Sequence, residues 1–123
     1  MGKKNKFKKK RIRPVALCVF LRDGKIFVAE GYDRILQQTF YRPLGGKIEF
    51  GERGSDTIIR ELKEEIDAEV ADVTYLGTLE NIFTYENQPG HEIALIYTGR
   101  FPDETLNQDD IVVEGIDDDT PLF

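Results

Sequence analysis

The residues from Gly45 to Ala68 constrain the fold of this chain more than any other stretch. Closely spaced glycines are followed by an apolar pattern with a helical period, which predicts a glycine-rich loop that runs into a short amphipathic helix. Ser55 is predicted to cap this helix by accepting a hydrogen bond from a free backbone N–H. Asp56 places negative charge in the first turn, where the helix dipole favours it. The predicted apolar face consists of Ile58, Ile59, Leu62 and Ile66.

Three glutamates, Glu61, Glu64 and Glu65, are predicted to cluster on the opposite face of this helix. Like charges at this spacing cost a helix about 0.2–0.5 kcal/mol per pair, so the cluster needs a reason. A bound divalent cation would turn this repulsion into a net attraction, because Mg²⁺ and Mn²⁺ prefer carboxylate oxygens and phosphate oxygens as ligands. The alternative interpretation is a solvated helix surface, since glutamate is a good helix former.

The context of these acids resembles the signature of the Nudix hydrolases. The matching positions are Gly46, Glu52, Arg60, Glu61, Leu62, Glu64, Glu65 and Ala68. Asp67 stands where the family pattern has glycine, and we expect it to adopt the left-handed C-cap conformation at modest cost. The resemblance implies an α/β fold, a Nudix-type α/β/α sandwich with a mixed β-sheet. The second helix of that fold is either reduced to residues around 103–113 or missing.

The resemblance also implies a reaction, the attack of water on the diphosphate of a nucleoside diphosphate joined to another group, with Mg²⁺ or Mn²⁺ as cofactor. The implied metal ligands are Glu61, Glu64 and Glu65, with Glu52 acting through water or orienting the helix, and a carbonyl oxygen of Gly46 or Lys47. Glu64 or Glu65 is the candidate general base. Arg60 is assigned a structural role within this catalytic set, because its guanidinium can bridge Glu52 to a helix carboxylate.

Four residues are predicted to contact the substrate. Arg42 is a candidate phosphate ligand, and Tyr41 is a candidate for stacking on a base, although one ring of the Phe40–Tyr41 pair is equally suited to the core. Gly45 allows the backbone to approach a phosphate closely, and Lys47 follows in the same loop.

Other downstream residues are weaker candidates. Family members often recruit a further acid from a later loop, and the sequence does not choose among Glu92, Glu104, Asp109, Asp110 and Glu114. His91, the only histidine, is more typical of a structural position than of an acid–base residue.

Composition limits the class of protein. The chain has 123 residues, of which 40% are hydrophobic, enough for one domain with a single core. The lone Cys18 lies in an apolar run and is predicted to be buried, which fits a reducing cytoplasm. No apolar run is long enough for a membrane span. We therefore predict a cytoplasmic protein with one domain over residues 14–123.

Charge is distributed unevenly along the chain. Residues 1–13 carry eight of the 17 Lys and Arg and no acid, so all 23 acids lie in the rest. The basic arm is predicted to be flexible, and the acidic domain argues against broad nucleic-acid binding. A small nucleotide is therefore the favoured partner. The arm alone suggests a less favoured alternative, action on RNA 5′ ends.

Apolar segments on both sides of the signature predict strands. They cover residues 14–21, 25–30, 39–44, 74–83 and 91–101, with a hairpin turn at Asp23-Gly24, a polar connection over 32–38 and a loop over 84–90. If the second helix is missing, one face of the sheet lacks a cover, and a homodimer is expected on that basis. The same shortness, with Asp67, motivates the main alternative function, a non-catalytic module that binds or senses nucleotides.

Overall fold

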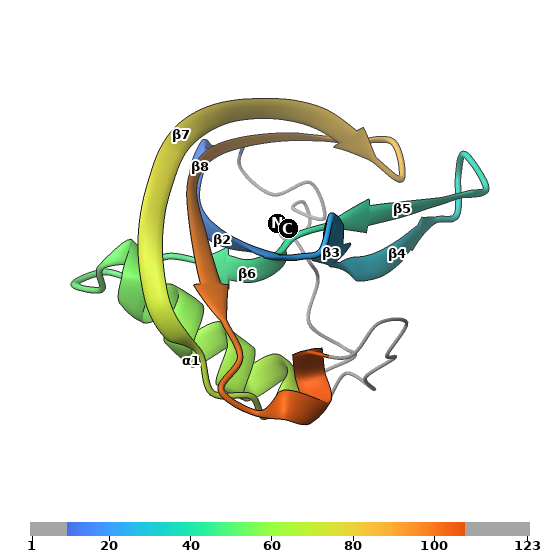
Figure 1. Ribbon diagram of the computed structural model, residues 1–123. Coiled ribbons are helices and arrows are strands. Elements are labelled where there is room, and N and C mark those ends of the chain that lie inside the picture. The colour runs from blue at the N-terminus through green and yellow to red at the C-terminus, as the bar shows by residue number, and fades with distance from the viewer. Residues whose placement is uncertain (1–9, 108–123) are drawn as a thin grey trace.

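The computed structural model describes residues 10–107, which form a mixed sheet, a small separate hairpin and one α-helix (Figure 1). The elements are β2 Arg13–Arg22, β3 Lys25–Phe27, β4 Ala29–Asp33, β5 Gln38–Arg42, β6 Leu44–Lys47, α1 Gly54–Ile66, β7 Ala71–Tyr85, β8 Gln88–Arg100 and the 3₁₀ helix η1 Glu104–Asn107. In this part of the chain no helix has the length and apolarity to cross a membrane. Most of the basic arm, together with Asp109, Asp110 and Glu114, lies outside the described residues.

Strand β2 is the centre of the sheet. It pairs in parallel with β8 over residues 13–19, and on its other side it pairs antiparallel with β6 and then with β3. The long strand β7 pairs antiparallel with β8 and forms the edge, which gives the order β3-β2-β8-β7. The mixed sheet predicted from the sequence is confirmed. Its centre is apolar because Ala16 and Cys18 face one side, and Val15 and Leu17 face the other.

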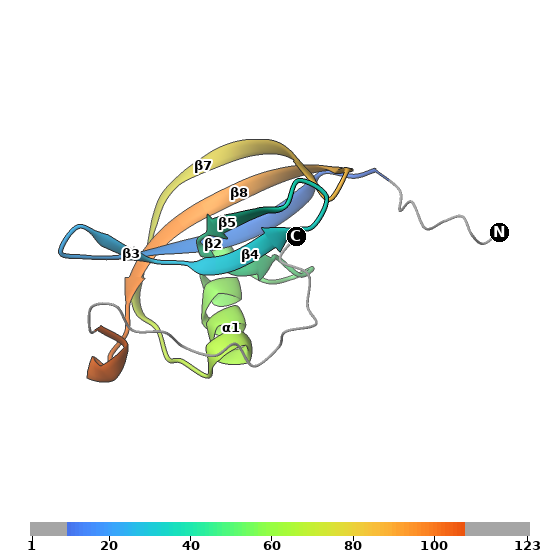
Figure 2. The same cartoon turned by 90° about the vertical axis from the view of Figure 1, so that its right-hand side faces the viewer.

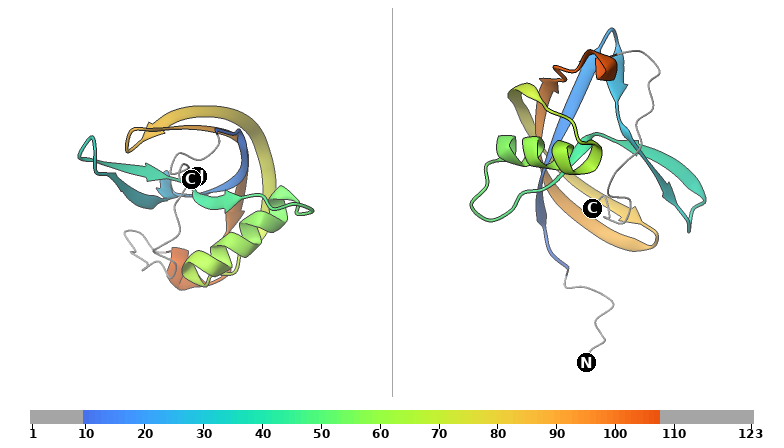
Figure 3. Two further views of the ribbon diagram at one scale, coloured as in Figure 1. Left: turned by 180° about the vertical axis from the view of Figure 1, so that it is seen from behind. Right: turned by 90° about the horizontal axis from the view of Figure 1, so that it is seen from below.

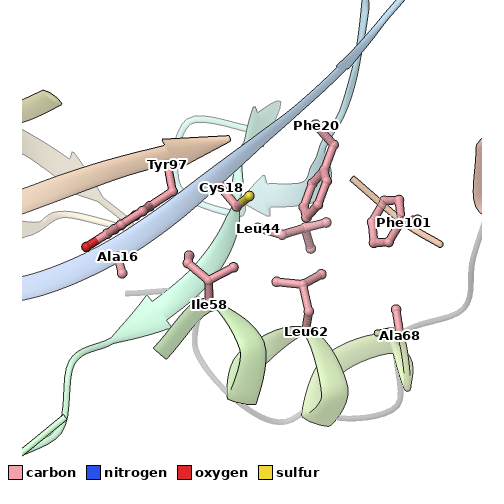
Figure 4. Packing of buried hydrophobic residues seen from close by; sticks show 9 residues of the cluster. All are labelled: Ala16, Cys18, Phe20, Leu44, Ile58, Leu62, Ala68, Tyr97 and Phe101. Atoms are coloured by element: carbon pink, nitrogen blue, oxygen red, sulfur yellow. The ribbon is translucent and has the colours of Figure 1, made fainter. Parts of the chain in front are cut away.

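Helix α1 covers one face of this sheet, as the side view shows (Figure 2). Ile58 and Leu62 are fully buried and point from the helix toward β2 and β6 (Figure 4). They pack in one cluster whose other members include Ala16, Cys18 and Leu44. Burial also raises the pKa of the Cys18 thiol to about 12, so this cysteine is a core residue, as predicted. Burial of each of these two helix side chains stabilises the folded state by about 1.5–3 kcal/mol.

The predicted start of the helix is wrong by two residues. The N-cap is Arg53 in an extended conformation, with no side-chain cap, and its carbonyl accepts the hydrogen bond of Thr57 N–H at 3.0 Å. Gly54 fills the first helical position because a Cβ there would lie 2.3 Å from the Tyr97 hydroxyl. Close packing against β8 therefore fixes the start, and Ser55 falls inside the first turn, where it cannot cap.

The end of the helix follows the prediction. Asp67 adopts the left-handed conformation, with φ 54° and ψ 40°. Its N–H donates to the carbonyl of Lys63 at 3.0 Å, and the next N–H, of Ala68, donates to that of Leu62 at 3.3 Å. The bond from Asp67 N–H to Lys63, four residues back, is that of the αL motif, in which glycine usually occupies the left-handed position.

Several predicted boundaries change. The strand over 25–30 is split into β3 and β4, and β4 pairs with β5 in a separate two-stranded sheet, which shortens the polar connection to the turn at 34–37. The loop over 84–90 shrinks to a two-residue turn at Glu86 and Asn87, both with positive φ. Gly45 and Gly46 belong to strand β6 and pair with Leu17 and Ala16, so they are not part of a loop.

The tips of the two hairpins meet far from the helix, at the right of Figure 1. Arg34 donates from Nε and Nη2 to the Glu86 carboxylate at 2.8 and 2.9 Å. Asp33 accepts backbone hydrogen bonds from its own turn and from Glu86 N–H, and the Phe40 and Tyr85 rings stack edge to face. These contacts fasten the β4–β5 hairpin, which Figure 3 shows beside the main sheet, to the end of the long β7–β8 hairpin.

The sheet face opposite α1 is buried at its centre. Val15, Leu17 and Ala94 are buried there and form a second cluster with the partly buried Ile96. Leu79 of β7, which pairs with Ala94 and so lies on the same face, is 61% exposed, and the homodimer expected from an uncovered face stays a prediction. Among the described residues α1 is the single α-helix, which agrees with the predicted loss or reduction of the second helix.

The C-cap yields a stability prediction. Asp67→Gly should raise the free energy of unfolding by about 0.5 kcal/mol, because glycine adopts positive φ without the Cβ penalty. Losing the exposed ion pair to Lys63 should matter little. Asp67→Ala is the control and should lower stability. Urea denaturation measures both, and a less stable glycine variant would contradict the assignment.

Candidate active site

Arg60 joins three parts of the signature through its guanidinium. It donates from Nε and Nη2 to the two oxygens of Glu52, at 2.8 and 3.0 Å. Nη1 donates to Glu61 Oε2 at 3.0 Å and to Glu64 Oε1 at 3.2 Å. Nη2 also donates to the carbonyl oxygen of Lys47 at 3.1 Å. The bridge between Glu52 and helix carboxylates expected from the resemblance is therefore present, and it also reaches strand β6.

Glu52 is fixed from several sides. Besides Arg60, it accepts hydrogen bonds from the Thr57 hydroxyl at 2.7 Å and from Glu49 N–H at 3.2 Å. These donors lower the pKa of Glu52 to about 2, the hydrogen bond from Arg60 being the largest cause. The same contact raises the pKa of Arg60. Glu52 is thus an anion held in place, and a fully buried threonine, Thr57, is the supporting residue that sequence reasoning missed.

Strand β6 lies against the first of the helix glutamates. A Cβ at Gly46 would lie 2.4 Å from the carboxyl carbon of Glu61, so only glycine leaves room for this side chain. Gly45 has φ +148°, and a Cβ there would lie 2.0 Å from the carbonyl oxygen of Ala16. Burial raises the pKa of Glu61, and the neighbouring Arg60 opposes that effect. The two glycines therefore bring a backbone and a carboxylate into contact.

The three glutamates do not share one exposed face, so that prediction is wrong. At about 100° per residue, Glu65 comes seven positions after Ile58 and lies nearly over it, at the border of the apolar face. Glu61 lies on the same border, and Glu64 alone is exposed, with 52% of its side chain accessible. The acids therefore form a strip along one edge of the helix, between the buried face and solvent.

The oxygen atoms of this strip are of the type that binds a hard divalent ion. Carboxylate oxygens and backbone carbonyls are the ligands that Mg²⁺ and Mn²⁺ prefer. Their present arrangement is different: across residues 10–107, no three His, Cys, Asp or Glu side chains converge closely enough to hold a metal ion. Arg60 instead holds oxygens of both Glu61 and Glu64. Its positive charge offsets part of the repulsion between these acids.

The predicted substrate contacts differ in accessibility. Tyr41 is 65% exposed and points outward from β5, whereas Phe40 is partly buried, so the pair divides as expected. Lys47 is exposed at the end of β6, close to Arg60 through its carbonyl. Arg42 is buried, with 9% exposed. Gly45 lies within β6, paired with β2.

The downstream acids lie apart from the helix strip or outside the described residues. Glu92 is buried on β8 and forms an ion pair with Arg13 across the parallel strands, at 3.4 Å. Glu104 is exposed in η1. His91 lies beside Glu92 on β8, in register with Ile82 of β7. None of these positions is brought to the Arg60 cluster by a contact that the structure records.

A family model described as NUDIX domain matches residues 11–117 of this chain. The chain belongs to the Nudix family. Two solved structures share its fold. A NUDIX hydrolase from Nitrosomonas europaea matches with a TM-score of 0.60 at 17% identity, covering 76% of this chain and 61% of that chain. A MutT NUDIX hydrolase from Burkholderia pseudomallei matches with a TM-score of 0.59 at 21% identity, covering 76% of this chain and 71% of that chain. This Nudix chain thus spans about three fifths of the first relative.

The Glu52–Arg60 pair predicts how stability depends on pH. Because the folded pKa of Glu52, about 2, lies below its usual 4.5, its stabilisation is fully present above about pH 5. It is lost as the pH falls toward about 2. The difference in urea midpoint between wild type and Glu52→Gln should therefore be constant near neutrality and shrink between about pH 4.5 and 3.

Glu80→Gln is the matched control, since it changes an exposed carboxylate on β7. That variant should track the wild type over the whole pH range. A midpoint difference for Glu52→Gln that stays constant down to pH 3 would show that the ion pair does not govern this part of the acid response.

Proposed function

We propose that this Nudix chain is a Mg²⁺- or Mn²⁺-dependent hydrolase that cleaves the diphosphate linkage of a nucleoside diphosphate joined to another group. The candidate substrates are a nucleoside triphosphate, ADP-ribose or another nucleotide sugar, and a dinucleoside polyphosphate. The observation that carries the proposal is the Arg60 cluster, which ties Glu52, Glu61 and Glu64 to the carbonyl of Lys47. A solvated helix surface would need neither this cluster nor the Gly46 contact beneath it.

The proposed roles follow from these positions. Glu61, Glu64 and Glu65 would hold the metal, and a carbonyl of β6 at Gly46 or Lys47 would join them. A bound divalent ion neutralises a diphosphate and acidifies an attacking water. Glu52, already ionised and held by three donors, orients Arg60 and through it the helix carboxylates. Glu64 is the most accessible of the acids, and it or Glu65 would accept the proton of the water.

The proposed substrate contacts are polar and aromatic groups beside β6. The exposed ring of Tyr41 offers a stacking surface for a base, and the exposed Lys47 offers a cation for phosphate. Gly45 keeps the strand free of a side chain next to them. The acidic domain favours a small nucleotide over a nucleic acid, and a homodimer is not required to complete this site.

The competing function is a non-catalytic module that binds nucleotides on the same fold. It would bind a nucleotide tightly without turnover under any divalent metal. The complete set of signature acids favours hydrolysis, because a binding module has no need for the partly buried Glu61, which costs free energy to desolvate.

Variants of two helix glutamates test the proposal. Glu64→Gln and Glu65→Gln should each lower kcat by at least about 100-fold, because each removes a metal-binding or proton-accepting oxygen. The assay measures phosphate or nucleotide release from the three substrate classes, with Mg²⁺, with Mn²⁺ and with a chelator. Turnover should vanish with the chelator.

Glu69→Gln is the matched control, because Glu69 follows the same helix and contacts only Lys63 among the recorded ion pairs of the described residues. Its activity should equal that of the wild type. Full activity of both Glu64→Gln and Glu65→Gln would overturn the assignment, and nucleotide binding without turnover of any substrate would favour the competing function.

A further inference from the structure

Strand β7 forms an outer edge of the main sheet. It pairs with β8 on one side, and among residues 10–107 no strand pairs with its other side (Figure 1). The backbone N–H and C=O groups along such an edge are a template for pairing with another strand. The run Gly77–Tyr85 is the regular part of this edge, because both register shifts between β7 and β8 come before it.

The opposite edge of the sheet is protected against such pairing, whereas this one is not. Strand β3 has 3 residues and begins with Lys25. Short strands and edge lysines are common devices that keep a sheet from joining another chain, and proline is a third. Strand β7 has 15 residues and contains no lysine, arginine or proline. Glu80 is the only charged side chain of the run Gly77–Tyr85, so this run lacks the usual protection.

Exposed apolar side chains lie on both faces of this edge. Leu79 is 61% exposed and pairs with Ala94, which puts it on the sheet face opposite α1. Ile82 is 75% exposed and comes three positions later in the strand, so it lies on the other face. A strand added beside β7 would cover part of both side chains. The edge therefore offers backbone hydrogen bonds and apolar burial at the same place.

The run is complementary to a second copy of itself. Two copies that overlap over their whole length in antiparallel order share a two-fold axis at the midpoint, which is Asn81. Leu79 then lies opposite the partner's Phe83 on the same face, which forms an apolar cross-strand pair. Glu80 lies opposite the partner's Ile82. The two glutamates are therefore not directly opposed, which matters because opposed like charges destabilise a sheet.

We propose that the protein forms a two-fold symmetric dimer in which the runs Gly77–Tyr85 of two copies pair antiparallel and join the two main sheets into one. The basis of this dimer is the free edge of β7, and not an uncovered sheet face. Assembly ends at two chains, because each run occupies the edge of the other and the β3 edge is protected. The Arg60 cluster lies within each chain, so the dimer is independent of the proposed function.

Sedimentation equilibrium of the full chain measures this association. The wild type should be a dimer at about 50 µM and should dissociate on dilution. Ile82→Glu should raise the dissociation constant at least about tenfold, because it places a second acid opposite the partner's Glu80. Ile82→Lys removes the same apolar side chain but places a cation opposite that glutamate. It should therefore dimerise at least about tenfold more tightly than Ile82→Glu.

Ile26→Glu is the matched control, because it makes the same change at a 51%-exposed position of the β3 edge. It adds the same net charge and should leave the dissociation constant unchanged. A cysteine at the two-fold axis tests the register directly. Asn81→Cys should form a disulfide-linked dimer on mild oxidation, since residues opposite each other in paired strands lie within disulfide reach. Gln88→Cys, exposed but far from the axis, should not.

Three results would overturn the inference. The first is a wild type that stays monomeric at about 50 µM, which would also be the result if another segment of the same chain covered the edge. The second is an Ile82→Glu variant that dimerises as tightly as the wild type, and the third is a cross-link at residue 88 but not at 81. Thermal unfolding checks that each variant is folded, and if Ile82→Glu does not fold, the cross-links decide. None of these results bears on turnover, which tests the proposed function separately.

Discussion

The ion pair between Arg60 and Glu52 is the interaction on which the rest of the site depends. It joins a helix to the loop that precedes it, and its remaining donors reach β6 and two further carboxylates. A bidentate arginine contact is rigid as well as strong, so it sets the distance between helix and strand. Without Arg60, Glu61 and Glu64 would lose the cation that both of them contact.

The sheet supplies the second constraint, which acts over long distances in the sequence. Parallel pairing of β2 with β8 puts Arg13 beside Glu92, 79 residues later in the chain. The same strand β2 holds β6 on its other side, and β6 leads directly to the helix. The Arg13–Glu92 ion pair and the approach of Gly46 to Glu61 can therefore form only after the sheet has formed. The candidate site is a product of topology as much as of the signature.

Local patterns in the sequence predicted the helix, the central strand, the long hairpin and the contact between Arg60 and Glu52. The left-handed Asp67 was also predictable, because its role depends on the residues next to it. The N-cap residue was not predictable from its neighbours. The packing of Gly54 against Tyr97, far along the chain, decides where the helix starts. The place of Gly45 in a strand was missed for a similar reason. Its pairing with Leu17, which is distant in the sequence, outweighs the usual preference of glycine for loops.

The position of Glu65 shows why family resemblance and helix geometry must be combined. The signature identifies the residue, but the turn of the helix places it over Ile58, at the edge of the core. A carboxylate there lowers stability unless a cation faces it, and the divalent ion that the signature implies is the candidate cation. The partly buried position of Glu65 thus agrees with the ion that the signature implies.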